Sequence, residues 1–258
     1  MSDLNVLFRK RIGIPEDETI TFSTLDRVLE KTAKTFPFEN LCNIENKTKD
    51  ITEESLLQKM LVRNEGGLCY ELNSLLYLFL LENGFHVTLV RGDVYKPETG
   101  EYQSLGRTHL TILLKHGEQT YLVDTGFGAN LPLKPVPLTG ETVTSATGQF
   151  RVINADTGPG DYRLELKLKH KDKEWRIGYA FDSTRPVSDL GEASEIQSII
   201  ARHPDSPFNK SRMVTKLTDR GNVTLTPHSL TRWEDGVVTK ESIDEKRFKE
   251  LLGELFTN

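Results

Sequence analysis

Cys69 is the residue of this sequence best placed to act as a nucleophile. It follows Gly66-Gly67 and begins an apolar stretch that is typical of a helix. The free N–H groups and the dipole at a helix N-terminus favour an anion, so they stabilise the reactive thiolate form of a cysteine. Cys69 could equally well be a small buried residue that closes the start of a helix. A base near the cysteine would favour the interpretation as a nucleophile.

His109 is the histidine that could supply this base. It lies inside the apolar strand expected over Thr108–Leu114, whereas the other histidines lie in turns, in loops or at the start of a strand. A hairpin turn centred on Gly117-Glu118 would place Thr111 opposite Asp124. Because side chains alternate along a strand, His109 and Asp124 would then share a face as diagonal neighbours, about 7–8 Å apart at the backbone. Taken alone, the pair could also be a core histidine and a carboxylate that caps a turn.

The combination of Cys69, His109 and Asp124 indicates a Cys–His–Asp triad for acyl transfer. His109 would accept the thiol proton, and Asp124 would hold the imidazole in one tautomer and stabilise its charged form. The histidine follows the cysteine by 40 residues, and the aspartate follows the histidine by 15. Papain-like proteases place their histidine roughly 130–150 residues after the cysteine, so this triad would stand on a different framework.

The elements that carry these residues change in character along the chain. Residues 1–84 read as helices, and residues 85–187 as short β-rich segments separated by turns, typical of a small antiparallel barrel or sandwich. Residues 188–258 combine helices with a hairpin. Capping residues favour helix starts at Ser2, at Ser23 or Thr24, and at Thr52. The sequence therefore predicts an α+β protein: a helical bundle, then a β-domain, then a small α/β piece.

Composition and charge restrict the class of protein. The chain has 258 residues, of which 36% are apolar and 28% charged, with a net charge of −5. This balance is that of an ordinary globular protein, and its acidity argues against a general nucleic-acid binder. The longest apolar run, Leu75–Leu81, is about a third of the roughly 20 residues that cross a bilayer, and the N-terminus lacks a signal pattern. We therefore expect a cytoplasmic protein that acts without nucleic acid or membrane.

The cysteine count supports this placement. The two cysteines are Cys42 and Cys69, whereas a secreted chain of this size would more often carry paired sets. Two cysteines are too few for a zinc site without other ligands, and no CxxC or HxxxH spacing is present. No metal is expected.

Several stretches of this sequence closely resemble the arylamine N-acetyltransferases, in particular those of bacterial type. The matching stretches occur in the family's order and together cover most of the chain. They are Pro37-Phe38-Glu39-Asn40-Leu41, Gly66-Gly67-Leu68-Cys69-Tyr70-Glu71-Leu72-Asn73, Thr108-His109-Leu110, Tyr121-Leu122-Val123-Asp124-Thr125-Gly126-Phe127-Gly128 and, more weakly, His203-Pro204-Asp205-Ser206-Pro207-Phe208. The second stretch, with its downstream histidine and aspartate, is the specific signal.

The resemblance implies a fold and a reaction. The fold would be a helical bundle over 1–84, an antiparallel β-barrel over 85–187 and an α/β lid over 188–258. The reaction would be ping-pong: Cys69 attacks the thioester of acetyl-CoA, and an arylamine or arylhydrazine then takes the acetyl group, with His109 managing the protons. Both steps exchange a thioester, which a thiolate or an amine attacks readily.

The resemblance also implies contacts for the two substrates. Phe38 and Phe127 would line the acceptor pocket, where an aromatic ring gains from stacking, and Phe208 would border the CoA cleft. Gly126 and Gly128 would let the pantetheine arm of CoA approach the backbone.

One position departs from the family pattern. The family usually has Arg directly before the two glycines, where it pairs with the Glu of the Pro-Phe-Glu-Asn-Leu stretch. This chain has Glu65 there, which would repel Glu39, and Arg63 lies two residues earlier. Either Arg63 substitutes for the missing arginine, or the bundle is held differently.

Other functions use the same residues. A Cys–His–Asp amide hydrolase or a transglutaminase-like acyltransferase would apply the triad to an amide. Within the family, the donor could be another acyl-CoA, such as malonyl- or propionyl-CoA, or the product could be an intramolecular amide. A binding protein with a decayed site is a further alternative, suggested only by Glu65.

Overall fold

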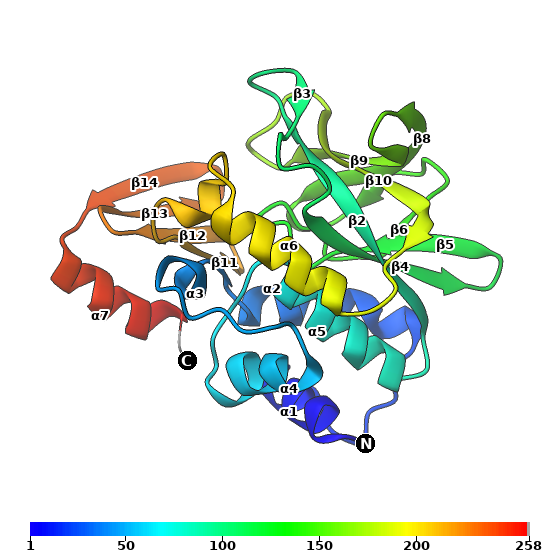
Figure 1. The fold of residues 1–258 in the computed structure, drawn as a ribbon, viewed down its shortest axis with the longest axis horizontal. Coiled ribbons are helices and arrows are strands. Elements are labelled where there is room, and N and C mark those ends of the chain that lie inside the picture. Colours follow the sequence, from blue (N-terminus) through cyan, green and yellow to red (C-terminus); the bar gives the residue numbers. More distant parts are fainter. Residues whose placement is uncertain (257–258) are drawn as a thin grey trace.

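The computed structural model describes residues 1–256, which form a helical part, a β-barrel and a C-terminal sheet (Figure 1). In Figure 1 the helical part is blue to cyan, the barrel is mostly green and the C-terminal strands are orange. Helix α6 (Gly191–Arg202, yellow) packs on α5 (Cys69–Glu82), so it shares the core of the helical part.

Capping residues and apolar patterning explain the helices of the N-terminal part. Ser2 accepts a hydrogen bond from the backbone N–H of Asn5, and Thr52 from that of Ser55, as the sequence predicts. Gly13 ends the first helix at φ 66°, a left-handed conformation that suits glycine. Helix α5 is apolar on nearly every face and lies in the middle of this part. The other helices are α1 (Asp3–Ile12), η1 (Phe22–Thr24), α2 (Leu25–Thr35), α3 (Leu41–Ile44) and α4 (Glu53–Leu56).

One helical segment differs from the expected regular helix. After α4 the chain continues as a wider π-helical turn, η2 (Leu57–Val62). Three consecutive residues of this turn, Lys59, Met60 and Leu61, are all buried. The wider turn thus accompanies the burial of Lys59.

The barrel is a nine-stranded sheet in which every pairing is antiparallel. Strands run in the order β6-β5-β4-β2-β10-β9-β8-β7, with β3 paired to β2, and contact between β6 and β8 nearly closes the sheet. This confirms the expected barrel. The strands are β2 (His86–Lys96), β3 (Glu101–Tyr102), β4 (His109–His116), β5 (Gln119–Val123), β6 (Val136–Pro137), β7 (Val143–Thr144), β8 (Gly148–Thr157), β9 (Gly160–Leu168) and β10 (Arg176–Pro186).

The register of the β4–β5 hairpin confirms the prediction. Ile112 pairs with Val123, and His116 with Gln119, which places the turn on Gly117 as expected. The even-numbered residues Leu110 and Ile112 of β4 pack against α5. The odd-numbered residues of this strand face the barrel interior, where Tyr179 also lies.

The C-terminal sheet has five strands in the order β1-β11-β12-β13-β14. Its first strand, β1 (Phe38–Glu39), comes from the helical part and was not predicted, and neither were β13 and β14. Every residue of β14 is exposed, so it shows no apolar alternation that would mark a strand. The elements are β11 (Val214–Thr218), β12 (Gly221–Thr226), β13 (Ser229–Glu234) and β14 (Val237–Ser242), with η3 (Pro207–Asn209) and α7 (Glu245–Phe256).

Two connections cross the expected domain limits. Strand β1 joins the C-terminal sheet, and α6 joins the core of the helical part. The division into 1–84, 85–187 and 188–258 stays a prediction. Within residues 1–256, no helix is long and apolar enough to cross a membrane.

Candidate active site

Cys69 is the first residue of α5 and is 5% exposed. The side chain of Glu71 accepts a hydrogen bond from Leu68 N at 3.0 Å and so caps this helix end. The sulfur of Cys69 lies 3.6 Å from the carbonyl oxygen of Thr108, the residue before His109. The nucleophile candidate is therefore held between the helix and the start of β4.

His109 and Asp124 are in direct contact, as the hairpin geometry predicts. Nε2 of His109 lies 2.7 Å from Oδ2 of Asp124, and both side chains are almost completely buried. Because Nε2 is engaged with the carboxylate, Nδ1 is the ring nitrogen left for the thiol of Cys69. Burial lowers the pKa of His109, but the negative charge and hydrogen bond of Asp124, together with a hydrogen bond to Cys69, raise it overall to about 10.

Each carboxylate oxygen of Asp124 has two polar partners. Oδ1 accepts from Asn73 Nδ2 at 2.8 Å and from Gly126 N at 2.7 Å. Oδ2 contacts His109 and accepts from the Tyr179 hydroxyl at 2.7 Å. Burial raises the pKa of Asp124, but His109 and these donors lower it overall, so the carboxylate is kept charged.

Sequence reasoning missed two of these partners, Asn73 and Tyr179. Asn73 lies four residues after Cys69 on the same face of α5, and its amide also donates to Leu110 O at 2.6 Å. The four-residue spacing could have indicated that Asn73 lies on the same side of the helix as Cys69. Tyr179 lies on β10, 55 residues after Asp124, and no local pattern links the two. Burial and the nearby carboxylate raise the pKa of Tyr179 well above its ordinary value, so it remains a hydrogen-bond donor.

The three phenylalanines predicted to bind substrate line one cleft of about 640 Å³. The rings of Phe38 and Phe208 meet edge to face at 5.6 Å. The ring of Phe127 contacts His109, with centroids 5.2 Å apart. The aromatic cleft thus borders the buried His109–Asp124 pair.

The two glycines have different surroundings. A Cβ on Gly126 would lie 2.6 Å from Cys69 Cα, so the bare backbone here lets the β5 turn pack directly on the nucleophile helix. Gly128 lines the cleft at φ 62°, and a Cβ there would meet open space. The structure thus explains Gly126 by its contact with Cys69, and contact of either glycine with CoA stays a prediction.

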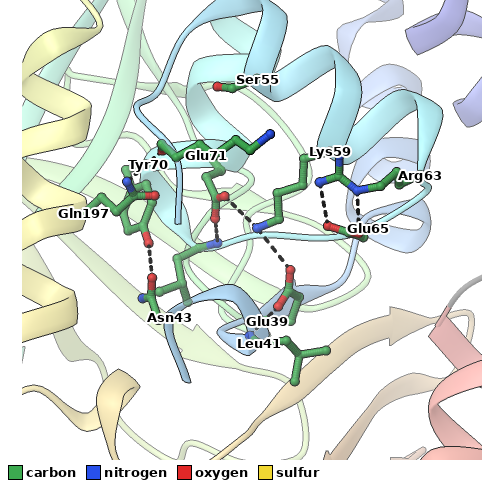
Figure 2. Close-up of polar contacts among 12 residues, drawn as sticks. Glu39, Leu41, Asn43, Ser55, Lys59, Arg63, Glu65, Tyr70, Glu71 and Gln197 are labelled. Carbon is green, nitrogen blue, oxygen red and sulfur yellow. Dashed lines mark hydrogen bonds and ion pairs between the residues drawn. The ribbon is translucent and has the colours of Figure 1, made fainter. Parts of the chain in front are cut away.

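The cation that pairs with Glu39 is not Arg63. Glu65 pairs with Arg63 at the surface, at 2.7 Å, so Arg63 does not substitute for the family's arginine. Glu39 is instead 3.3 Å from the ammonium of Lys59, which also lies 2.6 Å from Glu71 (Figure 2). The bundle is therefore held differently, by a buried lysine.

A second and larger cavity, of about 760 Å³, lies away from these residues. It is bordered by Glu39, Cys42 and Gly66 on one side and by Leu252 and Phe256 of α7 on the other. Neither cavity is lined by Cys69, His109 or Asp124, but the aromatic cleft is lined by Phe127, whose ring contacts His109, so this cleft is the better candidate for chemistry. Among residues 1–256 there is no cluster of three or more side chains that could hold a metal ion.

Comparison with known proteins decides the family. A sequence model of the N-acetyltransferase family matches residues 21–257. The structure is similar to an arylamine N-acetyltransferase from Bacillus cereus, with 40% identity, a TM-score of 0.94 and coverage of 100% of this chain and 99% of that one. The chain belongs to the arylamine N-acetyltransferase family.

Two other members of the family are informative. The uncharacterized acetyltransferase YvcN of Bacillus subtilis is 41% identical, over 99% of this chain and 98% of that protein. The Mycobacterium marinum arylamine N-acetyltransferase, solved in complex with CoA, is 25% identical with a TM-score of 0.83, covering 97% of this chain and 91% of that one. The Bacillus cereus enzyme is described as having a unique Cys-His-Glu catalytic triad, whereas the carboxylate that contacts His109 in this family member is an aspartate.

Proposed function

We propose that this protein transfers the acetyl group of acetyl-CoA to the nitrogen of arylamines or arylhydrazines through an acetyl-Cys69 intermediate. The observation that carries the proposal is the buried contact between His109 and a fully hydrogen-bonded Asp124, beside Cys69 and an aromatic cleft. Family membership and the CoA complex of the Mycobacterium marinum relative support the donor.

In the first half-reaction, Cys69 attacks as a thiolate that the imidazolium of His109 stabilises. The thiolate attacks the thioester carbonyl of acetyl-CoA, the bond to the CoA sulfur breaks, and the CoA thiolate leaves with the proton held by His109. Asp124 keeps a proton on Nε2 and stabilises the imidazolium. The product is acetyl-Cys69 and free CoA.

In the second half-reaction, the amine nitrogen attacks the carbonyl carbon of acetyl-Cys69. His109 accepts the proton that the amine loses and returns one to the departing Cys69 sulfur, so the enzyme is regenerated. Phe38, Phe127 and Phe208 would hold the aromatic ring of the acceptor, and their edge-to-face arrangement suits such a ring. Gly126 and Gly128 would lie along the pantetheine arm.

The substrates proposed here are small molecules, and the proposal includes no metal, nucleic acid or membrane partner. A cytoplasmic location is part of it, since Cys69 is a free thiol that has to stay reduced to react. Family membership favours an acyl-CoA donor over the amide substrate of a hydrolase.

The test is the intact mass of the protein after brief mixing with acetyl-CoA alone. We expect a gain of one acetyl group in the wild type and none in Cys69→Ala, and loss of this acetyl group when an arylamine is added. Cys42→Ala is the matched control and should be acetylated like the wild type. If acetyl-CoA, propionyl-CoA and malonyl-CoA all leave the mass unchanged, the proposal is wrong.

A further inference from the structure

Lys59, Glu39 and Glu71 form a buried ion cluster in the helical part (Figure 2). The lysine and Glu71 side chains are each 8% exposed, and that of Glu39 is 4% exposed. The ammonium of Lys59 lies 2.6 Å from Glu71 Oε1 and 3.3 Å from Glu39 Oε1. Lys59 does not line the cleft, so it can influence a substrate only through its two partners.

Glu39 connects the cluster to the acceptor side of the cleft. It follows Phe38 in the chain, and its other oxygen accepts a hydrogen bond from Leu41 N at 2.6 Å. The backbone that follows Phe38 is thus anchored through the carboxylate of Glu39. The ring of Phe38 in turn meets the ring of Phe208 edge to face.

Glu71 connects the cluster to the nucleophile. Its Oε2 accepts from Leu68 N at the start of α5, directly before Cys69. Two backbone hydrogen bonds join the same turn to β1: Glu39 N donates to Gly67 O at 3.0 Å, and Gly67 N donates to Pro37 O at 3.1 Å. Lys59 therefore links, through side chains, two segments that already run side by side.

The charges explain why this link matters. Burial lowers the pKa of Lys59, but the two carboxylates raise it overall, so the ammonium stays charged between them. Without it, two buried carboxylates would face each other with no counter-charge, and they would repel. Arg63 cannot take its place because it is bonded to Glu65, where both side chains are more than a third exposed.

We propose that Lys59 is a positioning residue that sets how well aromatic acceptors react, by holding Phe38 at a fixed distance from Cys69. This inference rests on the proposed function and deepens it. A small acceptor without a ring does not use Phe38, so its reaction with acetyl-Cys69 should depend little on Lys59. An arylamine needs the contact with the ring of Phe38, and a small displacement of this ring would strongly lower the rate at which the arylamine reacts.

The experiment compares two acceptors in Lys59→Met, which keeps the length of the side chain but removes its charge. The isolated acetyl-enzyme is reacted with an arylamine, such as 4-anisidine, and separately with hydrazine. We expect the arylamine rate to fall about tenfold or more, while the hydrazine rate and the acetylation of Cys69 stay within about threefold of wild type. An equal fall with both acceptors, or no fall with either, would overturn the inference.

Matched variants separate this role from a general loss of stability. Arg63→Met removes a neighbouring exposed cation and should leave both rates unchanged. Lys59→Arg keeps the charge and should recover most of the arylamine rate. If Lys59→Met does not fold, Glu39→Gln replaces it: the amide oxygen can still accept from Leu41 N, but the attraction to Lys59 is lost. The same selective fall is expected, and a parallel loss of both rates refutes the idea.

A binding measurement keeps the inference separate from the proposed reaction. If the wild type forms no acetyl-Cys69, the proposed function fails. The role of Lys59 is then judged by a fluorine NMR titration of unmodified protein with 4-fluoroaniline. We expect Lys59→Met to weaken binding about tenfold relative to Arg63→Met. Equal dissociation constants would exclude a role for Lys59 at the cleft.

Discussion

Replacing Asp124 by Asn should change the tautomer of His109 rather than the fold. The aspartate accepts hydrogen bonds on both oxygens, from Asn73, Gly126 and Tyr179, and it contacts Nε2 of His109. An asparagine oxygen can keep the Asn73 and Gly126 bonds at Oδ1. Its NH₂ group then faces Nε2, so that nitrogen has to accept and the ring proton moves to Nδ1. Nδ1 is the nitrogen that the Cys69 thiol needs as its base.

The size of the effect follows from the same contacts. Asp124 raises the pKa of His109 to about 10 against the effect of burial. Relative to the ordinary value of 6.5, this corresponds to about 5 kcal/mol of stabilisation of the imidazolium, and Asp124→Asn removes most of it. Because the wrong tautomer also blocks proton transfer, we expect the acetylation rate of Cys69 at pH 7 to fall by about 10³ to 10⁴.

The assay is the single-turnover acetylation of Cys69 by acetyl-CoA between pH 6 and 9, followed by quenched-flow mass spectrometry. The wild-type rate should vary little over this range because His109 holds its charge below about pH 10. The rate of Asp124→Asn should rise with pH, since hydroxide replaces the lost base. Asp161→Asn, whose carboxylate accepts from Ser183 at a barrel turn, is the control and should match the wild type. If the acetylation rate of Asp124→Asn is within about tenfold of the wild-type rate and has the same pH profile, the assigned role of Asp124 is refuted.

Three further predictions concern the surroundings of this pair. Gly126→Ala should lower the free energy of unfolding by about 1–3 kcal/mol, because its Cβ would lie 2.6 Å from Cys69 Cα; an unchanged urea midpoint contradicts the close contact. Tyr179→Phe removes a donor to the charged Asp124 and should cost about 1.5–3 kcal/mol, measured by the same unfolding curves; a cost near zero would mean that the hydroxyl does not serve the carboxylate. The raised pKa of His109 means that the folded state binds an extra proton between pH 6.5 and about 10, so this stabilisation is complete below pH 6.5 and is lost as pH rises toward 10. The melting temperature of the wild type should therefore fall over that range relative to Asp124→Asn, and parallel curves would disprove the coupling.

The contact between His109 and Asp124 was predictable because short-range rules determine it. A hairpin turn at Gly117 sets the register of β4 against β5, and the register puts His109 and Asp124 on one face. The helix start at Cys69 follows from the apolar pattern after the two glycines. These are local patterns, which can be read from the sequence.

Other features could not be predicted because they depend on contacts between distant segments. Tyr179 reaches Asp124 only after β10 pairs with β2, and its sequence surroundings are those of an ordinary strand tyrosine. Lys59 stands in an apparently amphipathic helix, where a lysine normally faces solvent. It is buried within the π-helical turn, between two carboxylates that come from other segments.

The short strand β1 makes the C-terminal sheet continuous with the turn that carries the nucleophile. Phe38 pairs with Thr215 of β11 on one side and bridges to Gly67 on the other. If the C-terminal sheet detached in a partial unfolding event, β1 would become an open edge with unpaired backbone groups. The amide of Asn40, which donates to Met213 O, would then exchange with solvent while the barrel amides stayed protected. Fluctuations of the chain's last third would thus set how long Cys69 keeps its reactive geometry.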